Sequence, residues 1–451
     1  MILYCNKLKY KTNSRMKYIY ILIITTTLFI TSSCSSKEKN LTANVSSIDI
    51  TPPVEIQYAL GGYGERMNKP AEGIHDRIWA KALVLKDEEK KYALVTLDIL
   101  GLPANVKTDL LKRVAGKGWT KENIMLLPSH SHGSLEMAAL NSKNLLNSPQ
   151  IGIFHPELLD FILNKLEKLL SDADQKHQPV KIGTHSKEIE GLNRNRRRQP
   201  FIDKELIVTR IDLKNGKPLA ALVNWTAHPT FIDGTDMLVS AEWCGYLQTE
   251  LQNKIGNDVT VMYYNGAEGD QSPVLDGPIN AYEKIQIYGE KMAEKAFDIY
   301  SEIKPQKNNQ FDFNYKTIKL PEYEAHPTFM ETGGAEYGLD ENTVKMVMAM
   351  LGPTEVGLGT IKIGDLIIAG VPGEMTAELG LEVKKSIKQD GTKYVAIGGL
   401  ANEWISYILS SDQYINGGGY ESSVSFYGPE LGEIITTKII DTSKELTKYK
   451  Q

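Results

Sequence analysis

The chain has 451 residues, of which 41% are hydrophobic and 24% charged, and its formal net charge is −5. This composition is typical of a globular protein with a sizeable core, and the slightly acidic balance gives no electrostatic support for a nucleic-acid partner. The basic run NRNRRR at 193–198 is too short to change that conclusion and is more typical of a solvated loop.

The N-terminus has the pattern of an export signal. Basic residues precede an apolar stretch at 18–30, and small residues then lead to Cys34 in the sequence TSSC. This order predicts a signal peptide of the lipoprotein type at 1–33, followed by a polar tether at 34–42. A membrane-spanning anchor is the alternative, but the apolar run is shorter than the ~20 residues that a span needs. We therefore expect an exported bacterial lipoprotein, anchored in a membrane by lipid on Cys34 and facing the periplasm or the cell surface.

The remaining chain alternates segments typical of strands and of helices. Apolar runs predict strands at 92–100, 123–127, 205–213, 218–225, 259–264 and 393–399, and a two-stranded hairpin over 360–372. Helical spacing of apolar residues predicts helices at 106–114, 155–170, 241–255, 280–303, 376–387 and 429–448. The turn sequences KNGK and Gly364-Asp365 predict hairpins, whereas the strand–helix–strand segments predict crossovers. Together they predict an α/β (α+β) fold in which helices flank a core of mixed β-sheet.

Two of the eight histidines stand one residue apart in PSHSHG (128–133), directly after the apolar run 123–127. Residues i and i+2 of an extended chain point to the same face, so both rings would face whatever lies beyond this strand. Either both histidines serve a site there, or one is an ordinary buried histidine and the other is solvated.

Other polar residues also follow predicted strands. His228 comes after 218–227, the loop NGAEGDQS comes after 259–264, and Glu374 comes after 365–373. Ligands of α/β proteins bind beyond the carboxyl ends of strands, and imidazole and carboxylate are the usual ligands of a catalytic zinc ion. The sequence thus indicates a metal site at the strand ends, although no short spacing motif supports the metal.

Seven motifs now fall in an order that resembles a known family. They are GIHDRIWAKALVL (73–85), SHSHG (129–133), NWTAHPT (224–230), GAEGDQSP (266–273), GVPGEMT (370–376), YILSSDQY (407–414) and YESSVSFYGP (420–429). Together they resemble the catalytic, N-terminal domain of neutral/alkaline non-lysosomal ceramidases, which are zinc-dependent amidases. The resemblance covers nearly all of 43–451, which we expect to form a single catalytic domain.

The resemblance implies one zinc ion per chain with four ligands: His130, His228, Glu374 and Tyr407. It also implies four further residues at the substrate: Ser272, which matches the proposed nucleophile of the family, His132, which faces the substrate carbonyl, Tyr420, and one arginine of 194–197, best matched by Arg196. Ser272 either attacks the substrate or assists a zinc-activated water molecule, and we favour the second role.

The activity implied is hydrolysis of an N-acyl amide bond, in ceramide (to sphingosine and a fatty acid) or in a related N-acyl lipid. Two departures concern the substrate region. The family continues His-x-His with Ser-Gly-Pro-Gly-Gly, whereas this chain has Gly133-Ser134-Leu135-Glu136, and Pro273 is followed by Val274 where the family usually has asparagine. The chemistry is thus expected to be kept, while the substrate pocket differs.

Two other classes of function stay open. One is a surface lipoprotein that binds lipid or glycan without catalysis, but a binding module has no need of all four types of metal ligand. The other is a metal-independent serine esterase, but the Gly-x-Ser-x-Gly motif of such enzymes is missing from the sequence.

Overall fold

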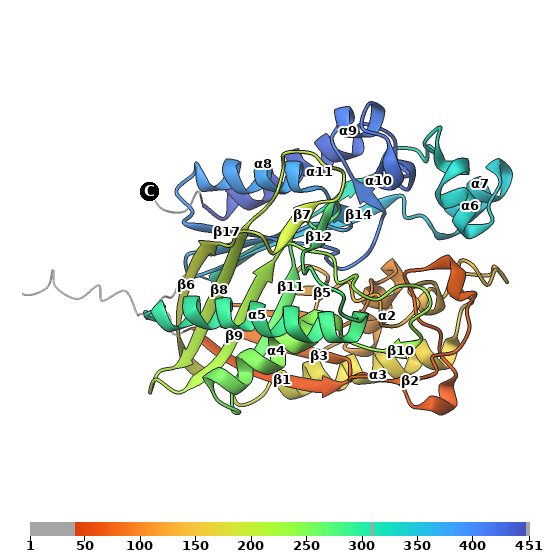
Figure 1. Ribbon diagram of the computed structural model, residues 1–451. Helices are drawn as coiled ribbons and strands as arrows, with labels where there is room; N and C mark the ends of the chain where they lie inside the picture. Colours follow the sequence, from red (N-terminus) through yellow and green to blue (C-terminus); the bar gives the residue numbers. More distant parts are fainter. Residues whose placement is uncertain (1–40, 308–310, 448–451) are drawn as a thin grey trace, which may run out of the picture. The chain divides into compact units, whose positions relative to one another are not determined.

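The larger of two β-sheets in the core has eight strands and is mixed (Figure 1). The computed structural model describes residues 41–307 and 311–447. The strand order of the eight-stranded sheet is β11-β9-β8-β6-β1-β3-β4-β5. The strands are β1 (Thr42–Asp49), β3 (Trp79–Lys86), β4 (Lys91–Leu97), β5 (Ile124–Pro128), β6 (Gln178–Glu188), β8 (Glu205–Leu213), β9 (Pro218–Trp225) and β11 (Thr260–Asn265). The pairs β4–β5 and β9–β11 are parallel and the other pairs are antiparallel, so the predicted mixed sheet is confirmed.

A second sheet of four strands has the order β13-β14-β15-β17. Its strands are β13 (Phe311–Lys319), β14 (Glu355–Ile363), β15 (Leu366–Gly370) and β17 (Tyr394–Gly398). The pair β15–β17 is parallel, and the two other pairs are antiparallel. Both predicted hairpins are present, as β8–β9 and β14–β15.

The two sheets pack face to face, and helices cover their outer faces (Figure 1). Strand β4 shows how the sequence produces this arrangement, because successive side chains of a strand point to opposite faces. Tyr92 and Leu94 enter the cluster that also holds Ile361 and Ile368 of the four-stranded sheet. Val95, one position along, packs instead into the cluster beneath the helices.

The covering helices match the predicted ones closely. Those against the eight-stranded sheet are α2 (Ala104–Arg113), α3 (Pro156–Ala173), α4 (Glu242–Ile255) and α5 (Ala281–Glu302). Those against the four-stranded sheet are α8 (Ala377–Lys388) and α11 (Leu431–Glu445). In α3 the residues Leu158, Ile162, Leu166 and Leu169 are buried at spacings of three and four, which places one apolar face on the sheet.

Short elements beyond the strand ends carry most of the polar side chains described below. Two-stranded pairs are formed by β2 (Gly73–Ile74) with β10 (Leu238–Val239), β7 (Asn193–Asn195) with β12 (Gln271–Pro273), and β16 (Glu374–Met375) with β18 (Tyr407–Ile408). The short helices are η1 (Val54–Ile56), η2 (Gly64–Arg66), η3 (Ala138–Leu140), η4 (Phe329–Glu331), α6 (Gly333–Tyr337), α7 (Glu341–Leu351), α9 (Ser411–Ile415) and α10 (Gly419–Ser423).

The predicted signal at 1–33 and most of the predicted tether at 34–42 lie outside the described residues. Among the helices of 41–307 and 311–447, none is long and apolar enough to cross a membrane.

Candidate metal centre and its cavity

A tight turn after β5 brings the two neighbouring histidines to one point. The backbone N–H groups of Ser129 and His130 donate to the carbonyls of Leu97 and Ile99, and His130 has a φ of 70°. Histidine enters this left-handed region more readily than most residues. The expectation of an extended chain through 128–132 is therefore wrong. The turn, and not strand alternation, places His132 Nε2 3.4 Å from His130 Nε2.

His228 joins this pair from the end of β9. Its backbone N–H donates to the carbonyl of Gln271 in β12, which fixes the chain directly after the strand. The ring centroid of His228 lies 5.0 Å from that of His130. One ring nitrogen from each of His130, His132 and His228 lies within 4.8 Å of the others, so this buried cluster could hold a metal ion.

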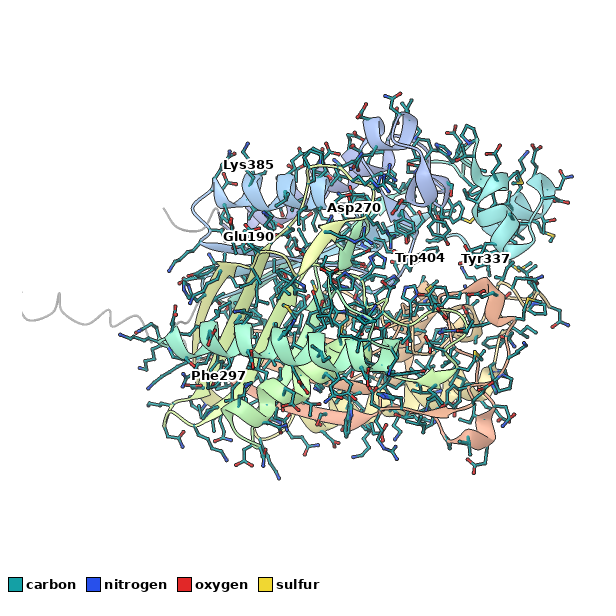
Figure 2. All side chains as sticks on the ribbon, in the orientation of Figure 1. Glu190, Asp270, Phe297, Tyr337, Lys385 and Trp404 are labelled. Atoms are coloured by element: carbon teal, nitrogen blue, oxygen red, sulfur yellow. The ribbon has the colours of Figure 1, made fainter. Side chains whose placement is uncertain are left out.

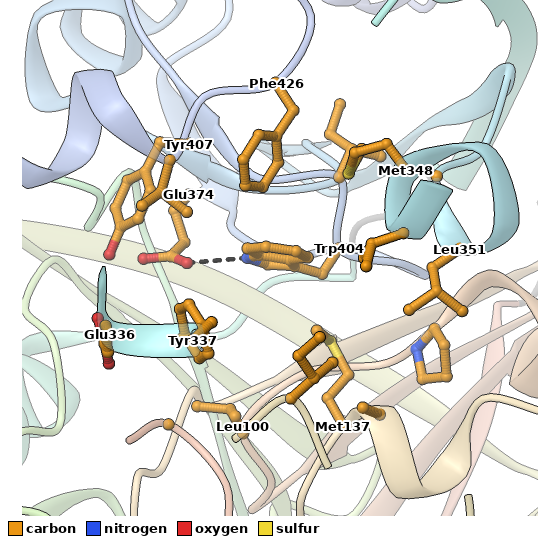
Figure 3. A pocket seen from close by; sticks show the side chains of 18 of the residues that line it. Leu100, Met137, Glu336, Tyr337, Met348, Leu351, Glu374, Trp404, Tyr407 and Phe426 are labelled. Carbon is orange, nitrogen blue, oxygen red and sulfur yellow. Dashed lines mark hydrogen bonds between the residues drawn. The ribbon is translucent and has the colours of Figure 1, made fainter. Parts of the chain in front are cut away.

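Glu374 in β16 reaches the same point from the other sheet. Its Oε2 lies 3.0 Å from His228 Nε2 and 3.4 Å from His130 Nε2, and its Oε1 accepts a hydrogen bond of 2.8 Å from Trp404 Nε1 (Figure 3). Burial alone would raise the pKa of Glu374, but His130 and His228 hold it well below its usual range. Trp404 thus anchors one carboxylate oxygen, and the other oxygen faces the Nε2 atoms of His130 and His228.

Tyr407 lies opposite Glu374 in the β16–β18 register. Its hydroxyl accepts a hydrogen bond of 2.9 Å from Arg196 Nη2, and Arg196 Nε donates to Glu421 Oε1 at 2.6 Å. Burial, followed by the charge of Glu374, raises the pKa of the Tyr407 phenol well above its usual value, although Arg196 opposes this shift. Tyr420 stands at this side too, with its ring centroid 6.1 Å from that of Tyr407.

The donor atoms fit a divalent transition metal. His130 Nδ1 donates to the carbonyl of Leu100 at 2.7 Å, and His228 Nδ1 donates to the carbonyl of Gln271 at 3.1 Å. A carbonyl can only accept, so Nδ1 is the donor in each bond, and Nε2 is the nitrogen of each ring that could bind a metal ion. Such outer hydrogen bonds orient metal-binding imidazoles in general. The residues offer two overlapping sets of ligands: the three histidines, or His130 and His228 with Glu374 and Tyr407.

A cavity of about 780 Å³ opens from this cluster. Figure 3 shows Glu374, Tyr407 and Glu336 at one end of it and Met348 and Leu351 at the other. The cavity wall includes seven of the predicted site residues: His130, His132, His228, Glu374, Tyr407, Arg196 and Tyr420. The structure therefore gathers all of the predicted ligands and three of the four predicted substrate contacts.

Ser272 is the predicted site residue that does not line the cavity. It lies in β12, opposite the exposed Arg194 of β7, and is partly exposed. Its neighbour Gln271 provides the carbonyl that receives the His228 ring. Asp270 anchors the same loop, because its Oδ1 accepts from the N–H of Ala377 in the first turn of α8 (Figure 2). Ser272 is thus one residue from a contact of the metal cluster, and its catalytic role stays a prediction.

Several residues of the site were missed by the sequence analysis. Trp404 and Tyr337 lie at the side of the protein where α6 and α7 are found (Figure 2), and both line the cavity. Arg66 is 2% exposed and donates to the carbonyls of Gly61, His132, Asp233 and Asp236, which fixes the turn that carries His132. The sequence GGYG at 61–64 is a local signal for this part of the site, because glycines often stand where two segments of the chain approach closely. In the structure a Cβ on Gly62 would lie 2.4 Å from His132 Nδ1.

The fold and the site define an α/β protein with a buried histidine cluster, which lies at the polar end of a cavity whose other end is apolar. Residues 42–292 match the family model for neutral/alkaline non-lysosomal ceramidase, N-terminal, and the chain belongs to this family. The predicted family is thereby confirmed.

Similar proteins agree with this assignment. The chain is 21% identical to the neutral ceramidase of Pseudomonas aeruginosa, over 82% of this chain and 66% of that protein, and therefore spans about two thirds of its length. It is 22% identical to the neutral ceramidase of Drosophila melanogaster, over 97% of this chain and 77% of that protein. The crystal structure of the Pseudomonas aeruginosa enzyme shares the fold, with a TM-score of 0.77 at 19% identity over 91% of this chain and 75% of that chain.

Proposed function

We propose that this protein is a zinc-dependent amidohydrolase that cleaves an N-acyl amide bond, in ceramide or in a related N-acyl lipid. The observation that carries the proposal is the histidine–glutamate cluster at the polar end of a cavity whose other end is apolar. The similarity to proteins named neutral ceramidase supports it.

The predicted ligands of the zinc ion are His130, His228, Glu374 and Tyr407. When bound, a zinc ion polarises a carbonyl oxygen and lowers the pKa of a water molecule to about 7. An amide needs this help because it is a weak electrophile and its nitrogen is a poor leaving group.

The side chains of the protein supply the proton transfers. His132 Nε2 lies beside the cluster, at 3.4 Å from His130 Nε2, where it can take a proton from the attacking water. The hydroxyl of that water is added to the acyl carbon, the C–N bond breaks, and the proton passes to the amide nitrogen. The products are then a fatty acid and an amine. Arg196 holds the Tyr407 hydroxyl and orients this side of the site.

Ser272 is proposed as a helper and not as the nucleophile. A serine nucleophile needs a base within hydrogen-bond reach, and Ser272 stands outside the cavity wall. It is instead positioned to act through Gln271, whose carbonyl holds His228.

The apolar end of the cavity is suited to an acyl chain. Five of its hydrophobic lining residues are Met137, Val344, Val347, Met348 and Leu351. An acyl chain placed there would have its amide at the cluster. We further propose that lipid on Cys34 anchors the protein in a bacterial membrane, where such amphiphilic substrates are found.

The proposal is tested by measuring zinc content and hydrolysis together. The wild type is assayed against short- and long-chain ceramides, N-acyl amino acids and simple esters, with and without a chelator. Amide hydrolysis that is lost on chelation and restored by zinc supports the proposal. Ester cleavage alone that a chelator leaves unchanged indicates a serine esterase, and no hydrolysis by the zinc-loaded protein indicates a binding protein.

The sequence offers a matched control for the metal ligands. His326-Pro327-Thr328 repeats the triplet His228-Pro229-Thr230, but the His326 ring bonds to the Tyr414 carbonyl and lies outside the cavity wall. His228→Ala should lose zinc and activity, whereas His326→Ala should keep both. Equal zinc content in the two variants contradicts the assignment of His228.

A further inference from the structure

Two glutamates on the cavity wall have no ion-pair partner within the described part of the chain. Glu136 and Glu336 both line the cavity that opens from the metal cluster. The other acidic residues of the wall are compensated, since Glu374 faces His130 and His228, and Glu421 pairs with Arg196 and Arg197. Two carboxyl groups therefore line the cavity without an ion pair to any described residue.

Glu136 is held rigidly in this position. Its backbone N–H donates to the carbonyl of Ala59, and one carboxylate oxygen accepts from the N–H of Ala138 at 2.9 Å. Gly152 makes room for the carboxyl group, because a Cβ there would lie 2.6 Å from Glu136 Cγ. The N–H of Met137 also bonds to this carboxyl group and, like the N–H of Ala138, lowers its pKa.

The charge of Arg66 offsets that of Glu136 only in part. The Arg66 guanidinium influences Glu136 but is occupied by four backbone carbonyls. Burial raises the pKa of Glu136 to about 7, against the smaller opposing effects of the Ala138 N–H and Arg66. A buried carboxylate whose charge is only partly compensated is costly, and a cationic ligand would reduce that cost.

Glu336 belongs to the same end of the cavity. Its Oε1 accepts a long hydrogen bond, 3.4 Å, from the N–H of Gly64. Burial raises the pKa of the neighbouring Tyr337 phenol, and Glu336, Glu136 and Glu374 add to that rise, so all three carboxylates lie within electrostatic reach of one ring. Figure 3 shows Glu336 and Tyr337 on the side of Glu374, away from Met348 and Leu351.

We propose that Glu136 and Glu336 select substrates that carry a positive charge on the amine part, a few atoms from the scissile amide. The inference rests on the proposed amidohydrolase function, with the acyl chain in the apolar end. Glu136 stands where the family pattern described above has glycine, so this carboxyl group belongs to the departure of this chain from that pattern.

The test uses three matched substrates that differ in one group. They are N-dodecanoyl-1,2-diaminoethane (ammonium), N-dodecanoylethanolamine (hydroxyl) and N-dodecanoyl-β-alanine (carboxylate). We expect the zinc-loaded wild type to show a kcat/KM for the ammonium substrate about tenfold or more above that for the hydroxyl substrate, which corresponds to about 1.4 kcal/mol. The carboxylate substrate should be the poorest.

Variants assign the preference to the two residues. Glu136→Gln and Glu336→Gln keep volume and hydrogen bonding but remove charge, so each should lower the ammonium-to-hydroxyl ratio, and the double variant should bring it near one. Glu341→Gln is the control, because Glu341 is exposed and does not line the cavity. Zinc content and melting temperature verify that each variant is folded.

Failure of this inference can be told from failure of the proposed function. Equal hydrolysis of the ammonium and hydroxyl substrates, unchanged in Glu136→Gln, would overturn the charge selection and leave the amidohydrolase function standing. Calorimetric binding of octylammonium and octanol to the zinc-loaded protein gives a measure that needs no turnover. Preferential binding of octylammonium without any amide hydrolysis supports the preference for positively charged ligands and overturns the amidohydrolase function. Equal binding of octylammonium and octanol overturns the preference for positive charge.

Discussion

Replacing Trp404 by phenylalanine is expected to weaken zinc binding although Trp404 is not a ligand. Trp404 Nε1 holds Glu374 Oε1 at 2.8 Å, while Glu374 Oε2 lies 3.0 Å from His228 Nε2. Phenylalanine keeps an aromatic ring in the cavity wall and removes the N–H. The carboxylate then loses the contact that fixes its orientation toward the cluster.

The size of the effect follows from the charge of the acceptor. A hydrogen bond to a charged group contributes about 1.5–3 kcal/mol, and a change of about 1.4 kcal/mol is tenfold in an equilibrium constant. If the full free energy of the hydrogen bond from Trp404 to Glu374 contributes to zinc binding, the zinc affinity falls by roughly 10- to 100-fold when this bond is removed. Loss of hydrogen bonds to metal ligands generally costs about this much affinity.

The affinity is measured by competition with a fluorescent zinc chelator. Trp79→Phe is the matched control, because the Trp79 side chain is 37% exposed at the start of β3 and does not line the cavity. Unchanged zinc affinity in Trp404→Phe would refute the reasoning, since Glu374 would then not be a ligand and the three histidines would hold the metal without it.

Four further predictions test the remaining assignments. His132→Ala should keep one zinc ion per chain while turnover falls by about 100-fold or more; loss of the zinc would instead make His132 a ligand. Ser272→Ala should reduce turnover strongly with normal zinc content, and unchanged turnover would remove Ser272 from the reaction. Burial raises the pKa of Glu242 from 4.5 to about 8, so the folded protein should lose stability as the pH rises through this range. Glu242→Gln should reduce the difference in melting temperature between pH 5 and pH 9, and an undiminished difference would contradict this. Cys34→Ser should release the protein from the membrane fraction or leave it unprocessed; normal attachment of this variant would exclude the lipid anchor.

The elements with a regular apolar pattern could be predicted from the sequence. The hairpins β8–β9 and β14–β15 and the long helices are encoded in local periodicity and turn residues. Helix α7 was missed although its signals are present: the side chain of Asp340 caps it by accepting from Thr343 N–H, and Val344 and Val347 are buried at helical spacing. The division into two sheets could not be predicted, because it depends on pairings between strands that are distant in sequence.

The candidate site could be predicted only where local sequence patterns determine it. Polar residues at the carboxyl ends of strands gather at one edge, so the meeting of His130, His228 and Glu374 followed from the strand assignments. The left-handed turn at His130 was not foreseen, because its φ depends on hydrogen bonds to the segment that follows β4. Trp404 was not foreseen either, since its loop reaches Glu374 only in the folded chain.

The predicted ligands are delivered by two different sheets. His130 and His228 follow β5 and β9 of the eight-stranded sheet, whereas Glu374 follows β15 of the four-stranded sheet. A metal ion at this position is therefore a crosslink between the two halves of the core, and the unfolded chain cannot assemble the same set of donors. By thermodynamic linkage, each tenfold excess of free metal over its dissociation constant adds about 1.4 kcal/mol to the free energy of unfolding. The amount of folded protein in the cell should accordingly follow the supply of the metal, so that scarcity removes the protein as well as its activity.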